Sequence, residues 1–264
     1  MKIAIIGAGA VGSTIAYALT IKNLATEIIL IDINEQRKEG EVMDVSDTLS
    51  LVETGNVRGG KPSDAGEADI IILTAGVAQK PNETRLDLVK KNVAITQNIF
   101  TSIGSIQKNA IVLVVTNPVD IITHVAQKLA KLPMAQVFGT GTTLDTARLK
   151  HSLGQHFGVS AQNIHGYVLG EHGDSEFVAW SSVSIGGVPT KNLDNFTVPM
   201  AEAMETAVKH EAYEIIERTG ATHYGIGLVV TNIVEAVILN QHLILPVSSK
   251  LHNWNGVSDV CLGA

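Results

Sequence analysis

A chain of 264 residues is long enough for two closely packed subdomains and too short for three. Its formal net charge of −7 opposes binding to phosphate backbones, and no cluster of basic and aromatic residues offsets it, so nucleic acid is not an expected partner. Hydrophobic residues make up 45% and charged residues only 17%, which is sparse for the surface of a monomer, so we expect an oligomer to cover part of the surface.

Cysteine usage limits the chemistry and the compartment. The single cysteine, Cys261, excludes an internal disulfide framework and the paired-cysteine spacing of a zinc site. A cytoplasmic location therefore fits best, and no metal is expected. The first residues could pass for a signal peptide, but their apolar run is short and is interrupted by glycines. The sequence contains no stretch of about 18 uninterrupted apolar residues, so it predicts no membrane span.

In the first half of the chain, short apolar runs alternate with segments of helical periodicity. Runs that are apolar on both faces are typical of parallel strands covered on both sides. The repeated order of strand, helix and strand predicts an α/β fold with a doubly wound parallel sheet and right-handed crossovers. The predicted strands are KIAII, EIILID, DIIILTAG and AIVLVVTNP, and the helical patterns rest on Val11, Ile15, Ala18 and Leu19 and on Val89, Val93 and Ile99.

The pattern changes after about residue 141. Mixed elements replace the regular alternation, so we expect a mixed α+β substrate domain at residues 142–264 after a nucleotide-binding domain at residues 1–141. The predicted elements are a helix at 144–158, a short strand at 167–173, an antiparallel hairpin at 177–189 broken by Gly186, Gly187 and Pro189, a helix at 201–220 ended by Gly220, and a helix at about 223–240.

Residues 7–12 read GAGAVG, directly after the first strand and at the start of the first helix, and Asp32 ends the second strand. Glycines alone also occur in ordinary strand-to-helix turns, but strand, glycines, helix and acid together match the dinucleotide-binding fingerprint. Gly7 permits the tight turn, Gly9 lets the backbone approach a pyrophosphate, and Gly12 allows close packing. Asp32 would accept from a ribose hydroxyl and repel a 2′-phosphate. The sequence therefore predicts a Rossmann domain that binds NAD rather than NADP.

The stretch GEHGDS, residues 170–175, contains a candidate acid/base, His172. An imidazolium can donate a proton to a carbonyl oxygen whose carbon receives a hydride, and can recover that proton from solvent near neutral pH. An orienting carboxylate would fix its tautomer and raise its pKa, and Asp145 is the candidate. Because the chain has nine histidines, a surface or structural role is the alternative for any one of them.

Two arginines complete the candidate site. Arg148 lies three residues after Asp145, so both project from nearly the same helix face, and the planar guanidinium suits a substrate carboxylate. Arg85 follows Pro81 and Asn82 in a predicted loop at the carboxyl edge of the sheet, where it could close over a substrate. Taken alone, either arginine could be a solvated salt-bridge residue.

Over essentially its whole length, the chain resembles the L-lactate/malate dehydrogenase family. The motifs GAGAVG with Asp32, TAGVAQKPNETRLDL, VVTNPVD, GTTLDTARL, GEHGDS and RTGATHYGIG occur in the family's order. The resemblance implies that His172 is the acid/base and Asp145 its partner. It also implies that Arg148 binds the substrate carboxylate and that Arg85 polarises the carbonyl. The implied substrate contacts are Asn117 and Thr222, and the implied NAD contacts beside Gly7, Gly9, Gly12 and Asp32 are Val11, Arg37, Gly76, Val77, Val115 and Thr140.

The resemblance places substrate choice at Gln79. A malate enzyme would carry an arginine there to pair with the second carboxylate of oxaloacetate. Burying that carboxylate beside a neutral glutamine costs several kcal/mol, so pyruvate and L-lactate are the expected substrates. A malate dehydrogenase or a dehydrogenase of another 2-oxo acid is the alternative within the family.

The resemblance also implies a homotetramer, and in many bacterial members an effector site for fructose 1,6-bisphosphate between subunits. His165 matches the histidine of that site, but Lys150 stands where an arginine is expected, so activation could be weakened or lost. Family members typically continue beyond the last predicted strand into a long helix near the active site. If the molecule lacks that helix, the alternative is a non-catalytic protein that binds NAD.

Overall fold

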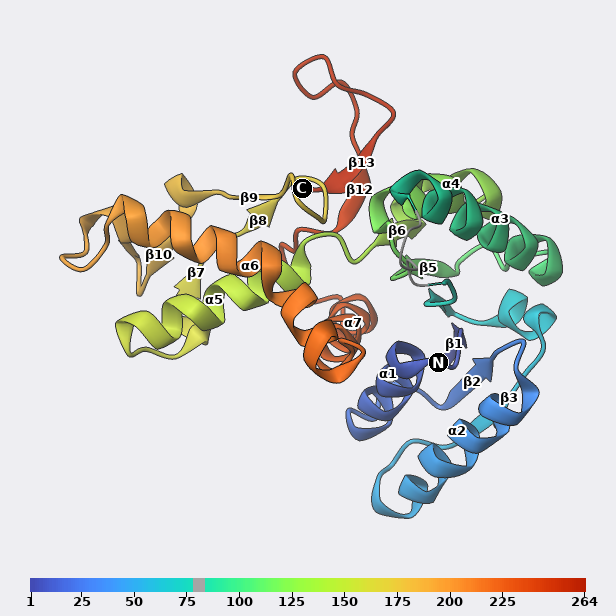
Figure 1. The fold of residues 1–264 in the computed structure, drawn as a ribbon. Helices are drawn as coiled ribbons and strands as arrows, with labels where there is room; N and C mark the ends of the chain where they lie inside the picture. The colour runs from blue at the N-terminus through green and yellow to red at the C-terminus, as the bar shows by residue number, and fades with distance from the viewer. Residues whose placement is uncertain (78–83) are drawn as a thin grey trace.

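The computed structural model describes residues 1–77 and 84–264, which form two lobes joined near the middle of the chain (Figure 1). The first lobe is built on a sheet flanked by helices. Its elements are β1 (Lys2–Ile6), α1 (Ala10–Ile21), β2 (Glu27–Ile31), α2 (Glu35–Asp47), β3 (Val57–Gly59), β4 (Ile70–Leu73), α3 (Arg85–Ile103), β5 (Ile111–Val114), α4 (Val119–Ala130) and β6 (Val137–Gly139).

The elements of the second half are shorter strands and three long helices. They are α5 (Thr143–Phe157), β7 (Ile164–His165), β8 (Val168–Leu169), β9 (Phe177–Val178), β10 (Ser184–Ile185), β11 (Val188–Pro189), α6 (Val198–Thr219), α7 (Tyr224–Ile238), β12 (Ser248–Lys250) and β13 (Cys261–Gly263).

The parallel sheet that the sequence predicts is present, and the first lobe gives it six strands: the four predicted ones and the short strands β3 and β6, which the sequence analysis did not predict. Their order, β3-β2-β1-β4-β5-β6, is the doubly wound order in which the chain starts at the centre and proceeds to each edge in turn. Along β1, Ile3 and Ile5 enter the core on one face, and Ala4 and Ile6 enter the core on the other. This alternation follows from the two-residue period of a strand, and it explains why the run KIAII carries no polar side chain after Lys2.

The second half of the chain completes the sheet and one of its faces. β12 pairs antiparallel with β6, and β13 pairs antiparallel with β12, so the sheet has eight strands within the described residues. Helix α7 packs against α1, and Val229, Val230 and Ile233 join the core on that face. The other face is covered by α3 and α4 (Figure 1). Residues from the end of the chain are therefore part of the nucleotide-binding layer.

The outer part of the second lobe has its own core, in which α5 and α6 pack on short strands. The predicted hairpin at 177–189 is confirmed only in its second half: β10 and β11 pair antiparallel, and Gly186 and Gly187 make the turn at positive φ. Its first residues were predicted wrongly, because β9 pairs with β8 in a separate sheet. The predicted end of the long helix at Gly220 is also confirmed, since Gly220 adopts φ +82° and caps α6. Among the described residues, no helix combines the length and apolar character needed to cross a bilayer.

Candidate active site

The turn between β1 and α1 excludes side chains at two glycines and leaves space at the third. Gly7 has φ +109°, and a Cβ there would lie 2.7 Å from the Ala75 nitrogen. A Cβ on Gly12 would lie 1.8 Å from the Gly7 oxygen, whereas a Cβ on Gly9 would meet no described atom within 4 Å. No described side chain caps the N-terminus of α1. An uncapped helix start beside open backbone fits the pyrophosphate of a dinucleotide.

Asp32 lies just beyond β2 and holds this turn in place. Its Oδ2 accepts from the Ala8 nitrogen at 2.7 Å, and its Oδ1 accepts from the Asn34 nitrogen at 2.8 Å. Each carboxylate oxygen has a second lone pair, so the half-buried Asp32 can still accept from a ribose hydroxyl. Arg37 is exposed on α2, with its Nε 3.9 Å from Glu41. The residues present therefore fit NAD at this end of the sheet.

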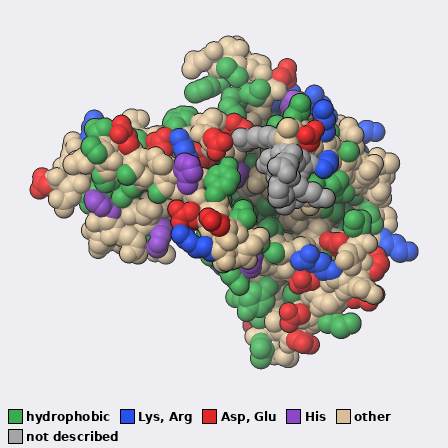
Figure 2. Space-filling model, viewed as in Figure 1, with side chains coloured by type: hydrophobic (Ala, Val, Ile, Leu, Met, Phe, Trp, Pro, Cys, Tyr) green, Lys and Arg blue, Asp and Glu red, His purple; other side chains and the backbone are tan. Residues whose placement is uncertain are grey.

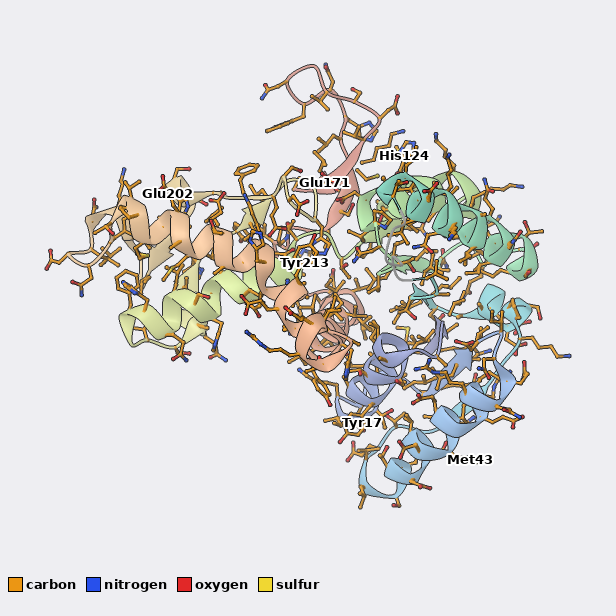
Figure 3. All side chains as sticks on the ribbon, viewed as in Figure 1. Tyr17, Met43, His124, Glu171, Glu202 and Tyr213 are labelled. Atoms are coloured by element: carbon orange, nitrogen blue, oxygen red, sulfur yellow. The ribbon has the colours of Figure 1, made fainter. Side chains whose placement is uncertain are left out.

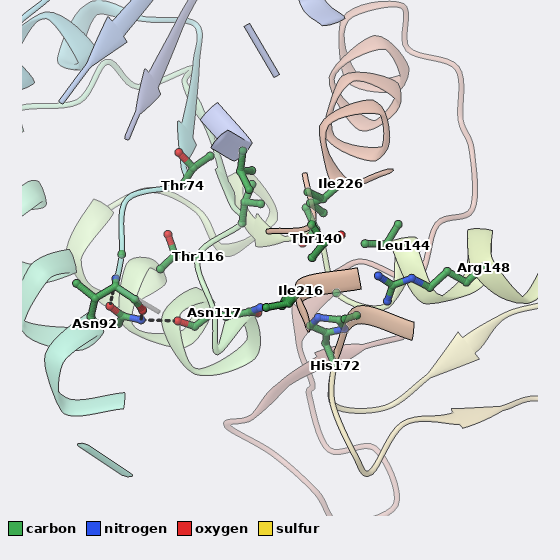
Figure 4. A pocket seen from close by; sticks show the side chains of 17 residues that line it. Thr74, Asn92, Thr116, Asn117, Thr140, Leu144, Arg148, His172, Ile216 and Ile226 are labelled. Atoms are coloured by element: carbon green, nitrogen blue, oxygen red, sulfur yellow. Dashed lines mark hydrogen bonds between the residues drawn. The ribbon is translucent and has the colours of Figure 1, made fainter. Parts of the chain in front are cut away.

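A cavity of about 290 Å³ continues from this turn into the space between the two lobes (Figure 4). It lies at the carboxyl ends of the parallel strands, where ligands bind in open α/β sheets. Both lobes supply sequence-predicted residues to its wall. The first lobe supplies Val11, Gly76, Val77, Val115, Asn117 and Thr140, and the second lobe supplies Arg148, His172 and Thr222.

Asn92, which the sequence interpretation did not single out, fixes two walls of the cavity. Its side chain is buried on α3, with Oδ1 accepting from the Val77 nitrogen at 2.9 Å. Its Nδ2 donates to the Asn117 oxygen at 2.8 Å and to the Val77 oxygen at 3.2 Å (Figure 4). Asn92 thus ties the segment after β4 to the segment after β5.

The segment that carries His172 is held in place by contacts with β13 and α4. Gly170 and Gly263 exchange two backbone hydrogen bonds of 2.9 Å, which join the segment to β13. The His172 nitrogen donates to Asp120 Oδ2 at 2.9 Å, and Ser248 Oγ donates to the other oxygen of that buried carboxylate at 2.5 Å. The backbone of His172 is therefore fixed by α4 and β12, elements far apart in the sequence.

His172 and Asp145 meet directly. Nδ1 of His172 lies 2.7 Å from Asp145 Oδ2, and the Asp145 side chain is 2% exposed. Burial opposes the imidazolium, but the hydrogen bond to Asp145 and the nearby Glu176 carboxylate raise the pKa of His172 to about 10. The hydrogen bond to His172 and the positive charges of His172 and Arg148 lower the pKa of Asp145 despite its burial. The geometry leaves Nε2 as the ring nitrogen available to a ligand in the cavity.

Arg148 lies one helical turn from Asp145 and shares it with His172. Its Nη1 is 3.0 Å from Asp145 Oδ1, and its Nε is 3.5 Å from Glu211 Oε1 on α6. A guanidinium has five N–H donors, so these two contacts leave donors for a bound carboxylate. Figure 4 shows Arg148 and His172, from different elements, on the wall of the same cavity.

Gln79 and the side chain of Arg85 lie outside the described residues, and Lys150 and His165 lie away from the cavity. For Arg85 the structure gives the backbone, which is the first residue of α3 rather than part of a loop, because Thr84 and Asp87 form a capping box that starts the helix there. Lys150 is half-buried on α5, with its Nζ 5.8 Å from the centre of the Tyr167 ring, and His165 is exposed on β7.

The structure adds residues that the sequence interpretation missed. Asn92, Asp120 and Ser248 act through buried polar contacts with segments distant in the chain, and the buried Glu176 lies beside His172. Only Glu176 carried a local signal, because it lies four residues after His172, but an acidic residue in a polar turn is normally exposed.

Comparison with known proteins identifies this arrangement. The family model for the NAD binding domain of lactate/malate dehydrogenases matches residues 1–139, and the model for their alpha/beta C-terminal domain matches residues 142–264. The chain belongs to the lactate/malate dehydrogenase family. Curated relatives include an L-lactate dehydrogenase from Acetivibrio thermocellus, 45% identical over 99% of this chain and 84% of that enzyme. Another, from Clostridium botulinum, is 44% identical over the same shares.

Solved structures agree with the family. The minor L-lactate dehydrogenase from Enterococcus mundtii superposes with a TM-score of 0.95 at 41% identity, covering 100% of this chain and 85% of that one. A lactate dehydrogenase from a Medee basin deep-sea metagenome library gives 0.94 at 36% identity, covering 99% and 85%. The chain is therefore an NAD-dependent oxidoreductase similar to L-lactate dehydrogenases, built on a parallel Rossmann sheet and a second α/β domain.

Proposed function

We propose that this chain is an L-lactate dehydrogenase that interconverts pyruvate and L-lactate, with His172 as the acid/base. The observation that carries the proposal is the 2.7 Å contact between His172 and the buried Asp145, on the wall of a cavity that Arg148 also lines. The relatives that carry the name L-lactate dehydrogenase support the choice of substrate.

In this proposal, NADH when bound supplies the hydride that goes to the carbonyl carbon of pyruvate. The carbonyl π bond breaks, and His172 delivers the proton from Nε2 to the oxygen, so that one C–H and one O–H bond form. Asp145 holds the ring through Nδ1 and stabilises the imidazolium before the proton leaves. In the reverse direction, neutral His172 accepts the hydroxyl proton of lactate.

Two arginines have proposed roles in binding and polarisation. Arg148 binds the substrate carboxylate with the N–H donors that Asp145 and Glu211 leave available. Arg85 polarises the carbonyl. Its backbone begins α3, the helix that also carries Asn92. A guanidinium near the carbonyl oxygen stabilises the negative charge that develops there.

Asn117 and Thr222 are proposed substrate contacts, and Gln79 is proposed to set substrate choice. Because Gln79 is neutral, a second substrate carboxylate beside it would be desolvated without a cation. Pyruvate is therefore expected to be preferred to oxaloacetate. Gln79→Arg is expected to move the kcat/KM ratio toward oxaloacetate, and an unchanged ratio would show that residue 79 does not select the substrate.

The test of the catalytic assignment is His172→Asn, compared with His210→Asn at an exposed histidine on α6. We expect His172→Asn to abolish NADH oxidation with pyruvate while NADH still binds, and His210→Asn to remain active. Turnover by His172→Asn at the wild-type rate would refute the assignment. NADH binding by the unaltered chain without turnover on any 2-oxo acid would instead support a non-catalytic NAD-binding protein.

We also propose a division of the sequence into an NAD-binding domain at residues 1–141 and a substrate domain at 142–264, although α7, β12 and β13 of the second segment pack on the sheet of the first.

A homotetrameric assembly is proposed as well. Large apolar side chains are exposed on α1 and α7, including Tyr17, Ile21 and Leu228, and Tyr17 points outward from its helix (Figure 3). Apolar side chains lie among the charged ones on the face shown in Figure 2. Light scattering is expected to give four times the chain mass of 28.0 kDa, and a monomer would contradict the assembly.

A regulatory proposal concerns Lys150 and His165. The half-buried Lys150 and the exposed His165 are proposed to bind fructose 1,6-bisphosphate more weakly than an arginine and histidine would. Weak activation by the bisphosphate that Lys150→Ala removes would support this site. Activation that survives Lys150→Ala would contradict it.

A further inference from the structure

Glu176 is a buried carboxylate that the mechanism above does not use. It lies immediately before β9, and its side chain is 2% exposed. Both of its carboxylate oxygens are buried without a hydrogen-bond partner among the described residues. Burying a carboxylate in this way costs free energy unless a neighbouring positive charge offsets the loss of hydration.

The group that Glu176 faces is His172. Oε2 of Glu176 lies 3.7 Å from His172 Nδ1, on the same ring nitrogen that contacts Asp145 at 2.7 Å. Nδ1 carries one hydrogen, and at 2.7 Å that hydrogen is donated to Asp145. At 3.7 Å the second carboxylate is beyond hydrogen-bond length, so it acts on the imidazolium through its charge.

We propose that Glu176 is a positioning residue that, together with Asp145, keeps His172 protonated and sets the upper end of the pH range in which the chain reduces a 2-oxo acid. This inference rests on the proposed function, because it assigns a second carboxylate to the same acid/base. An opposite charge within about 4–6 Å shifts a pKa by about 1–3 units, so the effect of Glu176 is large enough to measure.

The ionisation of Glu176 itself supports this role. Burial and repulsion from Asp145 raise the pKa of Glu176, while His172 opposes the rise. Glu176 therefore gains its charge at a higher pH than an exposed glutamate would. Once charged, the Glu176 carboxylate opposes loss of the His172 proton as the pH rises further.

Among the described residues, other ionisable groups around His172 and Asp120 lie on α5, α6, α4 and β13, and none of these duplicates Glu176. Arg148 on α5 is paired with Asp145 and with Glu211 of α6, so its charge is largely balanced. Asp120 on α4 accepts from the backbone of His172, and burial raises the pKa of that carboxyl. Cys261 on β13 interacts with Asp120, and its thiol is neutral because burial raises its pKa to about 11.

The test compares Glu176→Gln with Glu205→Gln in the full chain. Glu205, on α6, accepts from the Val178 nitrogen two residues beyond Glu176 and pairs with Lys209, so its change removes a nearby carboxylate that does not face His172. The readout is kcat/KM for pyruvate reduction against pH. We expect Glu176→Gln to lower the midpoint of the alkaline decline by about one unit or more, with little change on the acid plateau, and Glu205→Gln to leave the midpoint unchanged.

An unchanged midpoint in Glu176→Gln, or the same shift in Glu205→Gln, would overturn the inference. If the unaltered chain does not reduce pyruvate, the proposed function fails first, and the two failures are thus distinguishable.

If Glu176→Gln does not fold, two other measurements replace it: the pH profile of Glu176→Asp and ¹⁵N NMR of the unaltered chain. Glu176→Asp keeps the charge but moves it one methylene farther from Nδ1, so it is expected to lower the midpoint by less than about one unit. An upward shift, or a loss of activity of equal size at every pH, would count against a role for charge. In the ¹⁵N spectrum, the His172 signal is identified by its absence from His172→Asn. It is expected to titrate well above the ordinary imidazole range, and a single step at about pH 6.5 would overturn the inference.

Discussion

Replacing Asp145 by asparagine removes one negative charge from the most buried contact of His172 and leaves the side-chain shape nearly unchanged. The amide oxygen of asparagine can still accept from Nδ1, so the ring can keep its orientation at the present distance of 2.7 Å. A hydrogen bond to a charged group contributes about 1.5–3 kcal/mol, which corresponds to a fall of about one to two units in the pKa of His172. Starting from a pKa of about 10, the imidazolium of the variant would lose its proton at correspondingly lower pH.

Initial rates of NADH oxidation with pyruvate, from about pH 6 to about pH 10, measure this effect directly. We expect Asp145→Asn to lose little activity at the acid end and about 10- to 100-fold at the alkaline end, with the midpoint shifted down by the same one to two units. A loss of equal size at every pH would refute this reasoning, because it would show that Asp145 orients the ring without stabilising its charge.

Three further predictions follow from other parts of the structure. Gly12→Ala places a Cβ 1.8 Å from the Gly7 oxygen and is expected to lower thermal stability, whereas Gly9→Ala enters open space and is expected to weaken NADH binding at unchanged Tm. Ser248→Ala removes the donor to the buried Asp120 and is expected to destabilise the fold by about 1–3 kcal/mol in urea unfolding, with loss of kcat because Asp120 also holds the His172 backbone. Because the folded pKa of His172 is raised from 6.5 to about 10, its stabilisation is complete below about pH 6.5 and is lost as the pH rises to about 10. The free energy of unfolding should therefore decline over that range in the unaltered chain and decline less in His172→Asn.

The first lobe was predictable from sequence because its signals are local. Strands β1, β2, β4 and β5 are continuous apolar runs, and burial on both faces of a parallel sheet requires that composition. The glycine turn was equally readable, since positive φ at Gly7 and close packing at Gly12 each demand a residue without a side chain. The spacing of Asp145 and Arg148 on one helix predicted that they lie together, and they form an ion pair.

The remaining features depend on contacts between distant segments, which leave no local pattern. Strand β12 reads SSK, a polar triplet that becomes a strand because it pairs with β6 and β13. The placement of α7 on the face of the sheet beside α1 follows from tertiary packing and not from its periodicity. Glu176 resembles an exposed acid in a polar turn, and only the folding of β8, β9 and α6 around it makes it a buried neighbour of His172.

The most direct test of the central claim is NADH oxidation by the purified 264-residue chain with pyruvate and with oxaloacetate as alternative substrates. We predict turnover on pyruvate with a kcat/KM well above that on oxaloacetate, and loss of that turnover in His172→Asn. Preference for oxaloacetate would contradict the role of Gln79, and NADH binding without reduction of either acid would contradict the assignment of this chain as a lactate dehydrogenase.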